Sequence, residues 1–168
     1  MANKEPKVKV QNLTKKFGDL LVLDNLNFEV EEGEFLCIVG PTGCGKTTFL
    51  NSLTRLYEPT SGEILVNGIP VDPKKQNISY IFQEYSSFPW LTVEQNIRFG
   101  LEIKKTPKAE ADANVEEMLD IVGLTKFRNY YPSQLSISML QRVAIARAFA
   151  TKPELLLMDE PYGQPVSY

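Results

Sequence analysis

A glycine-rich segment, Gly40 to Thr47, reads GPTGCGKT and matches the pattern G-x-x-x-x-G-K-[ST]. Glycines let a backbone wrap closely around phosphate oxygens, and the N-terminus of the following helix favours an anion. The pattern predicts that Lys46 reaches the β- and γ-phosphates of a nucleotide and that the Thr47 hydroxyl binds Mg²⁺. A glycine-rich turn before a helix, without any ligand, is the alternative interpretation.

Two adjacent carboxylates end the apolar segment LLLMDE, Leu155 to Glu160. Asp159 is predicted to hold Mg²⁺, directly or through water, and Glu160 to polarise an attacking water. An apolar strand that ends in Asp-Glu is common, so the prediction depends on the glycine-rich segment upstream. Gln83 follows another short strand, residues 77–82. It is an ordinary loop residue by itself, and its functional role depends on the same two sites.

Hydrophobic patterns indicate which elements position these residues. Alternating apolar residues predict half-buried strands at Val8–Leu13 and Leu26–Val30, and the wholly apolar Phe35–Val39 predicts a strand buried on both faces. A helix with apolar residues on one face follows the glycine-rich segment. Asn67-Gly68, after the strand Glu63–Val66, predicts a hairpin.

The region from Leu91 to about Tyr131 has a helical pattern. Thr106 is predicted as a helix N-cap, with Pro107 at the first helical position, and Gly123 as the stop. The apolar stripe between them predicts the buried face of that helix. The stripe consists of Val115, Met118, Leu119 and Val122.

The composition excludes several classes of function. The chain has 168 residues, 43% hydrophobic and 23% charged, with a net charge of −3, so no overall attraction to nucleic acid is expected. It has no histidine, which excludes imidazole chemistry. Cys37 and Cys44 lack metal-ligand spacing and are predicted to be reduced thiols of a cytosolic protein. No secretory signal or membrane span is expected, so membrane association would require a partner.

Five segments in a fixed order resemble the ATP-binding subunits of ABC transporters: GPTGCGKTT, IFQE, FPWLTVEQNI, LSxxxxQRVAIARA and LLLMDEP. The resemblance runs from about Val8 to Pro161. It implies an α/β fold, a P-loop NTPase core of the RecA-like type with an antiparallel β subdomain and a helical insertion. Residues 1–90 and 141–161 would form the core and β subdomain, and residues 91–140 the helical subdomain that docks on a membrane subunit.

The resemblance also implies roles for individual residues. Phe17 would stack on adenine, with a buried core aromatic as the alternative, and Gln83 would contact the γ-phosphate and Mg²⁺. Lys46, Gln83 and Glu160 are the implied catalytic residues, and Thr47, Gln83 and Asp159 the implied metal ligands. The implied nucleotide-binding residues of the glycine-rich segment are Gly40, Pro41, Thr42, Gly43, Cys44, Gly45, Lys46, Thr47 and Thr48.

The family implies an ATPase that binds ATP and Mg²⁺ and couples hydrolysis to solute import. Its implied partners are transmembrane permease subunits and a second ATP-binding subunit in a head-to-tail dimer. Such a subunit is cytoplasmic and peripheral on the inner face of the cell membrane. The segment FPWLTVEQN is most similar to importers of nitrate, sulfonate or taurine. A GTPase is excluded because the chain has no Asn-Lys-x-Asp motif.

The chain departs from the family pattern before QRVAIARA. The family reads Leu-Ser-Gly-Gly there, at a helix N-terminus that caps the γ-phosphate of ATP on the other subunit, whereas this chain has Ile137 and Ser138 in place of the glycines. A β-branched side chain adds bulk and restricts the backbone. Two interpretations stay open: Ser136 or Ser138 only caps the helix, or Ser136 also contacts phosphate.

The sequence after LLLMDEP also departs from the family. Residues 162–168 replace a family loop, and the next family strand and histidine have no counterpart. We therefore expect a truncated member with an incomplete central sheet and impaired hydrolysis. The strands Phe35–Val39 and Leu155–Met158 would re-pair directly, accept another chain, or fold poorly. A nucleotide-binding but catalytically inactive module is the alternative function.

Overall fold

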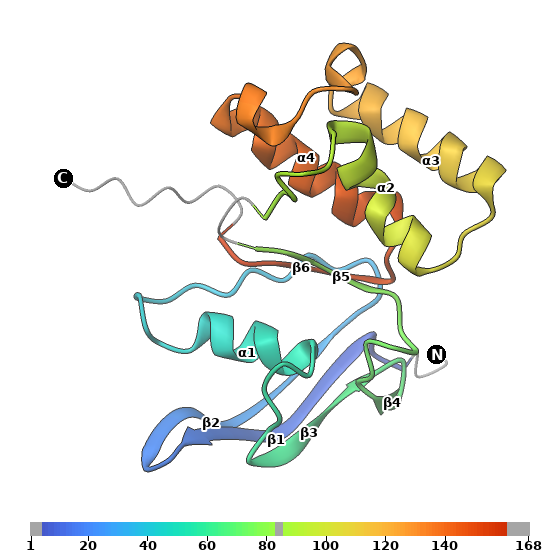
Figure 1. Ribbon diagram of the computed structural model, residues 1–168. Coiled ribbons are helices and arrows are strands. Elements are labelled where there is room, and N and C mark those ends of the chain that lie inside the picture. The colour runs from blue at the N-terminus through green and yellow to red at the C-terminus, as the bar shows by residue number, and fades with distance from the viewer. Residues whose placement is uncertain (1–4, 83–85, 161–168) are drawn as a thin grey trace. The chain divides into compact units, whose positions relative to one another are not determined.

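The computed structural model describes residues 5–82 and 86–160, which contain six strands and four α-helices (Figure 1). They belong to two units, residues 1–76 and 77–168, which are described in turn. Within the described ranges, none of the helices has the length and apolar character that crossing a bilayer requires.

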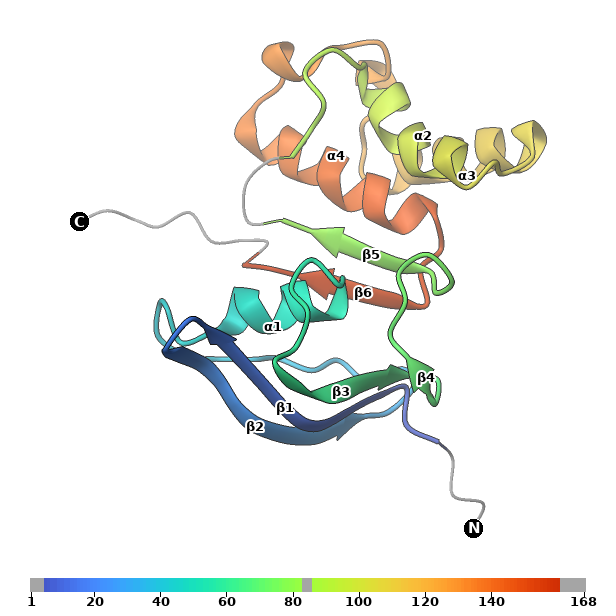
Figure 2. The same ribbon diagram turned by 60° about the horizontal axis from the view of Figure 1, so that its bottom comes forward.

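The first unit is an antiparallel sheet with one helix beside it (Figure 2). Its order is β2-β1-β3-β4, and helix α1 packs Phe49 against Phe28 of β2, with 5.4 Å between ring centroids. The Asn67-Gly68 hairpin is confirmed, because both residues have a positive φ between β3 and β4. The elements are β1 (Val8–Phe17), β2 (Leu20–Val30), α1 (Lys46–Leu53), β3 (Ser61–Val66) and β4 (Ile69–Pro70).

The predicted strand Phe35–Val39 is wrong. Neither sheet of the described residues includes this segment, and the side chains of Phe35 and Val39 are 78% and 88% exposed. A strand needs neighbours that pair its N–H and C=O groups, so an apolar run without a ladder partner stays irregular. Cys37, expected in that strand, is likewise exposed. Among the described residues, Leu155–Met158 pairs with Ile78–Ile81.

The second unit places three helices on one face of a two-stranded parallel sheet (Figure 1). The short sheet agrees with the expected incomplete central sheet. Its core lies among the helices, where Ile97, Leu119 and Val143 are at most 1% exposed. The elements are β5 (Ile78–Ile81), α2 (Val93–Ile103), α3 (Lys108–Ile121), η1 (Thr125–Phe127), η2 (Pro132–Gln134), α4 (Ile137–Ala150) and β6 (Leu155–Met158).

The predicted stripe and stop of helix α3 are confirmed. Val115 and Leu119 are fully buried, Met118 and Val122 pack against the same core, and Gly123 follows the helix with a φ of 67°. The predicted N-cap, Thr106, is wrong by one residue. Pro107 occupies the N-cap position with an extended ψ of 139°, so the helix begins at Lys108.

An ion-pair network joins α2, α3 and the turn that follows η1. Glu94 accepts from Arg98 at 3.2 Å and from Arg128 at 3.0 Å. The two arginines reach Asp112 and Glu116, each at 2.6 Å. The hydrogen bond from Arg128 lowers the pKa of Glu94 most, burial opposes this shift, and Arg98 lowers the pKa further.

Acid is expected to weaken the unit through Glu94. Its folded pKa lies below the ordinary value of 4.5, so the unfolded chain binds the proton first and the stabilisation disappears as the pH falls through the folded pKa. The unfolding free energy of the unmodified chain should fall between pH 6 and pH 3. In Glu94→Gln this fall should be smaller by about 1 kcal/mol. Urea unfolding at both pH values measures this fall. Glu117→Gln, at an exposed glutamate of α3, is the control; an equal fall in Glu94→Gln and the unmodified chain would contradict the prediction.

Candidate functional site

The glycine-rich segment turns back on itself before α1 begins. The Cys44 N–H donates to the Pro41 carbonyl at 3.3 Å, and Gly45 is the N-cap of α1 with a φ of 101°. A Cβ on Gly45 would lie 2.9 Å from Cδ2 of Leu23 and 3.1 Å from the carbonyl oxygen of Val22. Only glycine fits here, because the positive φ and the close approach of β2 both exclude a side chain.

Lys46 folds its ammonium group back over this turn. Its Nζ donates to the carbonyl oxygens of Gly40 at 2.8 Å and Pro41 at 3.1 Å. No side chain caps the start of α1, its first turn has no acidic residue, and Thr47 is exposed there. The segment therefore combines a cation, uncapped helix N–H groups and a hydroxyl, which are the groups that bind phosphate.

Phe17 ends β1 with 42% of its side chain exposed, so the alternative of a buried core aromatic is wrong. Its ring meets Tyr57 edge to face at 5.2 Å, and the Lys15 ammonium lies 4.8 Å from the ring centroid. An exposed, laterally supported ring can accept a planar base. The stacking on adenine stays a prediction.

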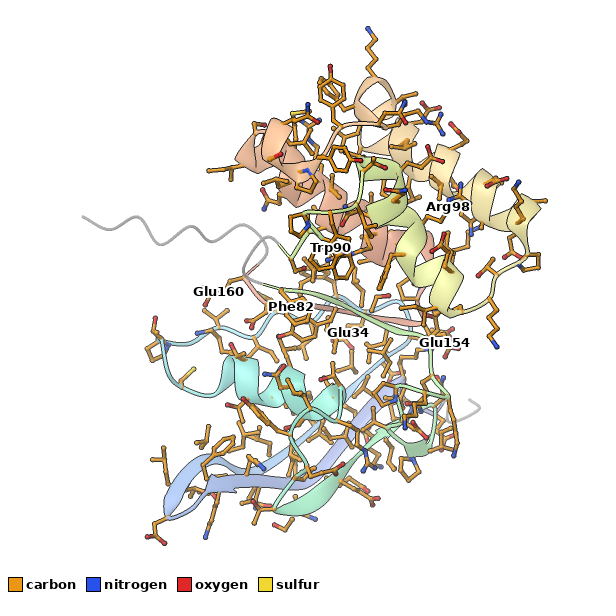
Figure 3. The ribbon with its side chains drawn as sticks, in the orientation of Figure 1. Glu34, Phe82, Trp90, Arg98, Glu154 and Glu160 are labelled. Atoms are coloured by element: carbon orange, nitrogen blue, oxygen red, sulfur yellow. The ribbon has the colours of Figure 1, made fainter. Side chains whose placement is uncertain are left out.

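The two predicted carboxylates lie at the carboxyl end of β6. The Asp159 N–H continues the parallel ladder by donating to the Ile81 carbonyl at 3.0 Å, and the residue is 6% exposed. Glu160 is exposed, with a φ of 46°. Figure 3 shows Glu160 and Phe82 at the same end of the two strands, with Glu154 at the other end.

Tyr80 contacts Asp159 and was not predicted as a site residue. Its hydroxyl donates to Oδ2 of Asp159 at 3.1 Å. Burial, followed by the neighbouring carboxylate, raises the pKa of Tyr80 well above 10, so the phenol stays neutral and remains a donor. The only signal in the sequence is a hydroxyl-bearing aromatic in an otherwise apolar strand, which is too weak to identify the contact.

Ser136 caps α4, so the predicted cap is confirmed. Its Oγ accepts from the Met139 N–H at 3.3 Å and lies 3.4 Å from the Ser138 hydroxyl, while Ile137 is 54% exposed at the first helical position. The start of α4 and the carboxyl end of β6 lie at the same end of the second unit (Figures 1 and 2). A contact between Ser136 and phosphate stays a prediction.

Gln83 lies outside the described residues, but two side chains anchor the segment that follows it. Arg147 donates to the Ser86 carbonyl at 2.7 Å and to its hydroxyl at 2.6 Å, and its guanidinium lies 5.1 Å from the Phe88 ring centroid. The fully buried Asn96 binds both the N–H and the C=O of Phe88. Sequence reasoning gave neither residue a role.

The oxygen ligands that the chain offers fit Mg²⁺. This ion prefers oxygen ligands and is usually held by one or two protein groups together with substrate phosphates. Asp159 offers a buried carboxylate and Thr47 an exposed hydroxyl, each within its own unit. The described residues contain no cluster of three or more His, Cys, Asp or Glu. A metal held largely by protein ligands therefore fits less well than Mg²⁺ bound together with phosphates.

Comparison with known sequences identifies the family over most of the chain. Residues 23–163 match the family described as ABC transporter. A sulfate/thiosulfate import ATP-binding protein of Synechocystis is 46% identical over 157 residues, 92% of this chain and 44% of the relative. Its counterpart in Mycobacterium bovis is 45% identical, over 92% of this chain and 45% of the relative. The chain thus spans about half the length of these relatives.

Solved structures share the fold. The ATP-binding cassette MJ0796, solved as a dimer in a post-hydrolysis state with ADP and Pi, has a TM-score of 0.81 and 36% identity, over 92% of this chain and 74% of that one. A second structure, cbiO1 of Clostridium perfringens from the transporter complex cbiONQ, has a TM-score of 0.83 and 28% identity. It aligns over 94% of this chain and 66% of its own.

Proposed function

Because the chain belongs to the ABC transporter family, we propose that it is the ATP-binding part of an importer, which binds ATP with Mg²⁺ at residues 40–48 and uses hydrolysis to drive transport. The observation that carries the proposal is the turn at Lys46. Its ammonium, the uncapped start of α1 and the exposed Thr47 hydroxyl all belong to one short segment. Together they supply the charge and N–H donors that phosphates require.

Each site residue has its own role in the proposed reaction. Lys46 binds the β- and γ-phosphates, and Thr47 and Asp159 hold the metal. Bound Mg²⁺ would neutralise phosphate charge as it develops. Glu160, exposed beyond β6, orients and polarises the attacking water. Gln83 contacts the γ-phosphate, and the exposed ring of Phe17 stacks on adenine.

We infer that the imported solute is an oxyanion. Two similar proteins are named for sulfate and thiosulfate import, and the solved cbiO1 belongs to a transporter complex. The dimeric form of a third relative favours pairing with a second ATP-binding subunit, head to tail. Permease subunits would hold the pair at the inner face of the membrane. No nucleic acid partner is proposed.

The start of α4 favours slow hydrolysis. Exposed backbone N–H groups at a helix N-terminus bind phosphate best when no side chain stands over them. Here the first helical residue is Ile137, 54% exposed, and the Ser136 oxygen already accepts from Met139. We therefore propose that the γ-phosphate bound on the partner is capped poorly, while binding at the chain's own residues 40–48 is unaffected.

Restoring both glycines tests this proposal. The double variant Ile137→Gly, Ser138→Gly should raise the steady-state ATPase rate at least about tenfold, because backbone donors regain access to the developing charge. The dissociation constant for ATP should change by less than about twofold. Phosphate release and nucleotide titration give the two quantities.

The matched control is Ile137→Ala, Ser138→Ala, which keeps both Cβ atoms and should give a smaller gain. Turnover of about 1 s⁻¹ or more by the unmodified chain, within the ordinary enzyme range, would contradict impaired hydrolysis. Intact ATP binding with no gain from the glycines would favour the alternative function, a nucleotide-binding module without catalysis.

A further inference from the structure

The register of the parallel sheet places a tyrosine on the same face as Asp159. β5 and β6 pair Tyr80 with Leu157 and Ile81 with Met158. Alternate residues of a strand share a face, so Asp159, two residues beyond Leu157, lies on the face of Tyr80. Ser79 points the opposite way, where its hydroxyl lies 3.0 Å from that of Thr151 at the end of α4.

The side chains of Tyr80 and Asp159 are in contact on this face. The Tyr80 hydroxyl donates to Oδ2 of Asp159 at 3.1 Å, and the Tyr80 ring packs against Phe82 with 4.5 Å between centroids. The backbone N–H of Asp159 is fixed by Ile81, so the residue is held at two points. Its other oxygen, Oδ1, accepts no hydrogen bond from the described residues.

From this geometry we propose that Tyr80 is a positioning residue, which fixes the Asp159 carboxylate in the orientation that binds Mg²⁺. A neutral phenol restrains one oxygen without cancelling the negative charge, and so leaves the carboxylate available to a cation. Groups that hydrogen-bond a metal ligand in this way typically change metal affinity or activity by about 10–100-fold. The inference rests on the proposed function, which assigns Mg²⁺ to Asp159.

The variant Tyr80→Phe removes only the hydroxyl. ATP affinity, followed with a fluorescent ATP analogue, is measured first in EDTA and then as a function of free Mg²⁺. The affinity in EDTA should stay within about twofold of the unmodified chain, and the Mg²⁺ concentration at half-effect should rise about tenfold. Tyr130→Phe, at a 42% exposed tyrosine that packs edge to face on Phe127, is the control and should change neither quantity.

Each other outcome overturns the inference. An unchanged Mg²⁺ midpoint in Tyr80→Phe means that Asp159 needs no help from the phenol, and the proposed function stands. If the ATP affinity of Tyr80→Phe is weakened equally in EDTA and in Mg²⁺, Tyr80 stabilises the fold and does not act on Mg²⁺ binding. If the unmodified chain, shown to be folded, bound no nucleotide under either condition, the proposed function would fail together with the inference.

Discussion

Replacement of Lys46 by alanine is expected to weaken ATP binding at least about a hundredfold, from a dissociation constant in the micromolar range at best. The ammonium lies over the turn, 2.8 Å from the Gly40 carbonyl and 3.1 Å from that of Pro41. A charge held there makes charge-assisted hydrogen bonds to phosphate, which are about twice as strong as neutral ones. Titration calorimetry at one fixed ionic strength measures the loss.

Two further variants test whether this loss of ATP affinity comes from the charge and the shape of the Lys46 side chain. Lys126→Ala removes an equal charge from the exposed η1 turn and should leave the ATP affinity within about twofold. Lys46→Arg keeps the charge but changes its shape, and should recover only part of the affinity. Equal ATP affinity in Lys46→Ala and the unmodified chain would contradict the assignment of the phosphate site to this segment.

Replacement of Asn96 by leucine is expected to lower the unfolding free energy by about 3 kcal/mol. The side chain is fully buried, and its amide donates to the carbonyls of Phe88, Leu91 and Thr92 at 3.0–3.1 Å. Its oxygen accepts from the Phe88 N–H at 2.8 Å. Leucine fills a similar volume but leaves the part-buried Phe88 N–H and Leu91 carbonyl without this partner. The Phe88 and Thr92 carbonyls still accept from the backbone N–H groups of Leu91 and Asn96. Urea unfolding followed by circular dichroism measures the difference.

The control for this variant is Asn129→Leu, at an exposed position of the same unit, which should change the unfolding free energy by less than about 0.5 kcal/mol. Equal stability of the two variants would show that residues 88–92 do not depend on Asn96. Because these residues follow Gln83 closely, Asn96→Leu should also weaken any response of the chain to the γ-phosphate.

The parts of the fold predicted best were those that depend on short sequence patterns. Asn67-Gly68 favours its turn through the two residues alone, and Gly123 ends its helix because it adopts a positive φ. The glycine-rich segment was recognised in the same way, since Gly45 must fit closely against β2. In each case a few neighbouring residues determine the conformation, so no distant contact is needed.

The errors arose where a distant partner decides the outcome. Phe35–Val39 has the apolar composition of a buried strand, but a strand also requires neighbours that composition does not reveal. Tyr80 and Arg147 were missed for the same reason, because their partners, Asp159 and Ser86, lie 79 and 61 residues away in the sequence. Only the parallel register of β5 and β6 brings Tyr80 to Asp159.

Binding of ATP at residues 40–48 is tested most directly by a nitrogen–proton correlation spectrum recorded during titration with Mg²⁺ and ATP. We expect the largest saturable shifts at the amides between Gly40 and Thr48, and we expect Lys46→Ala to abolish them. A well-dispersed spectrum of folded protein in which these amides do not move, or in which saturable shifts occur only elsewhere, would contradict it.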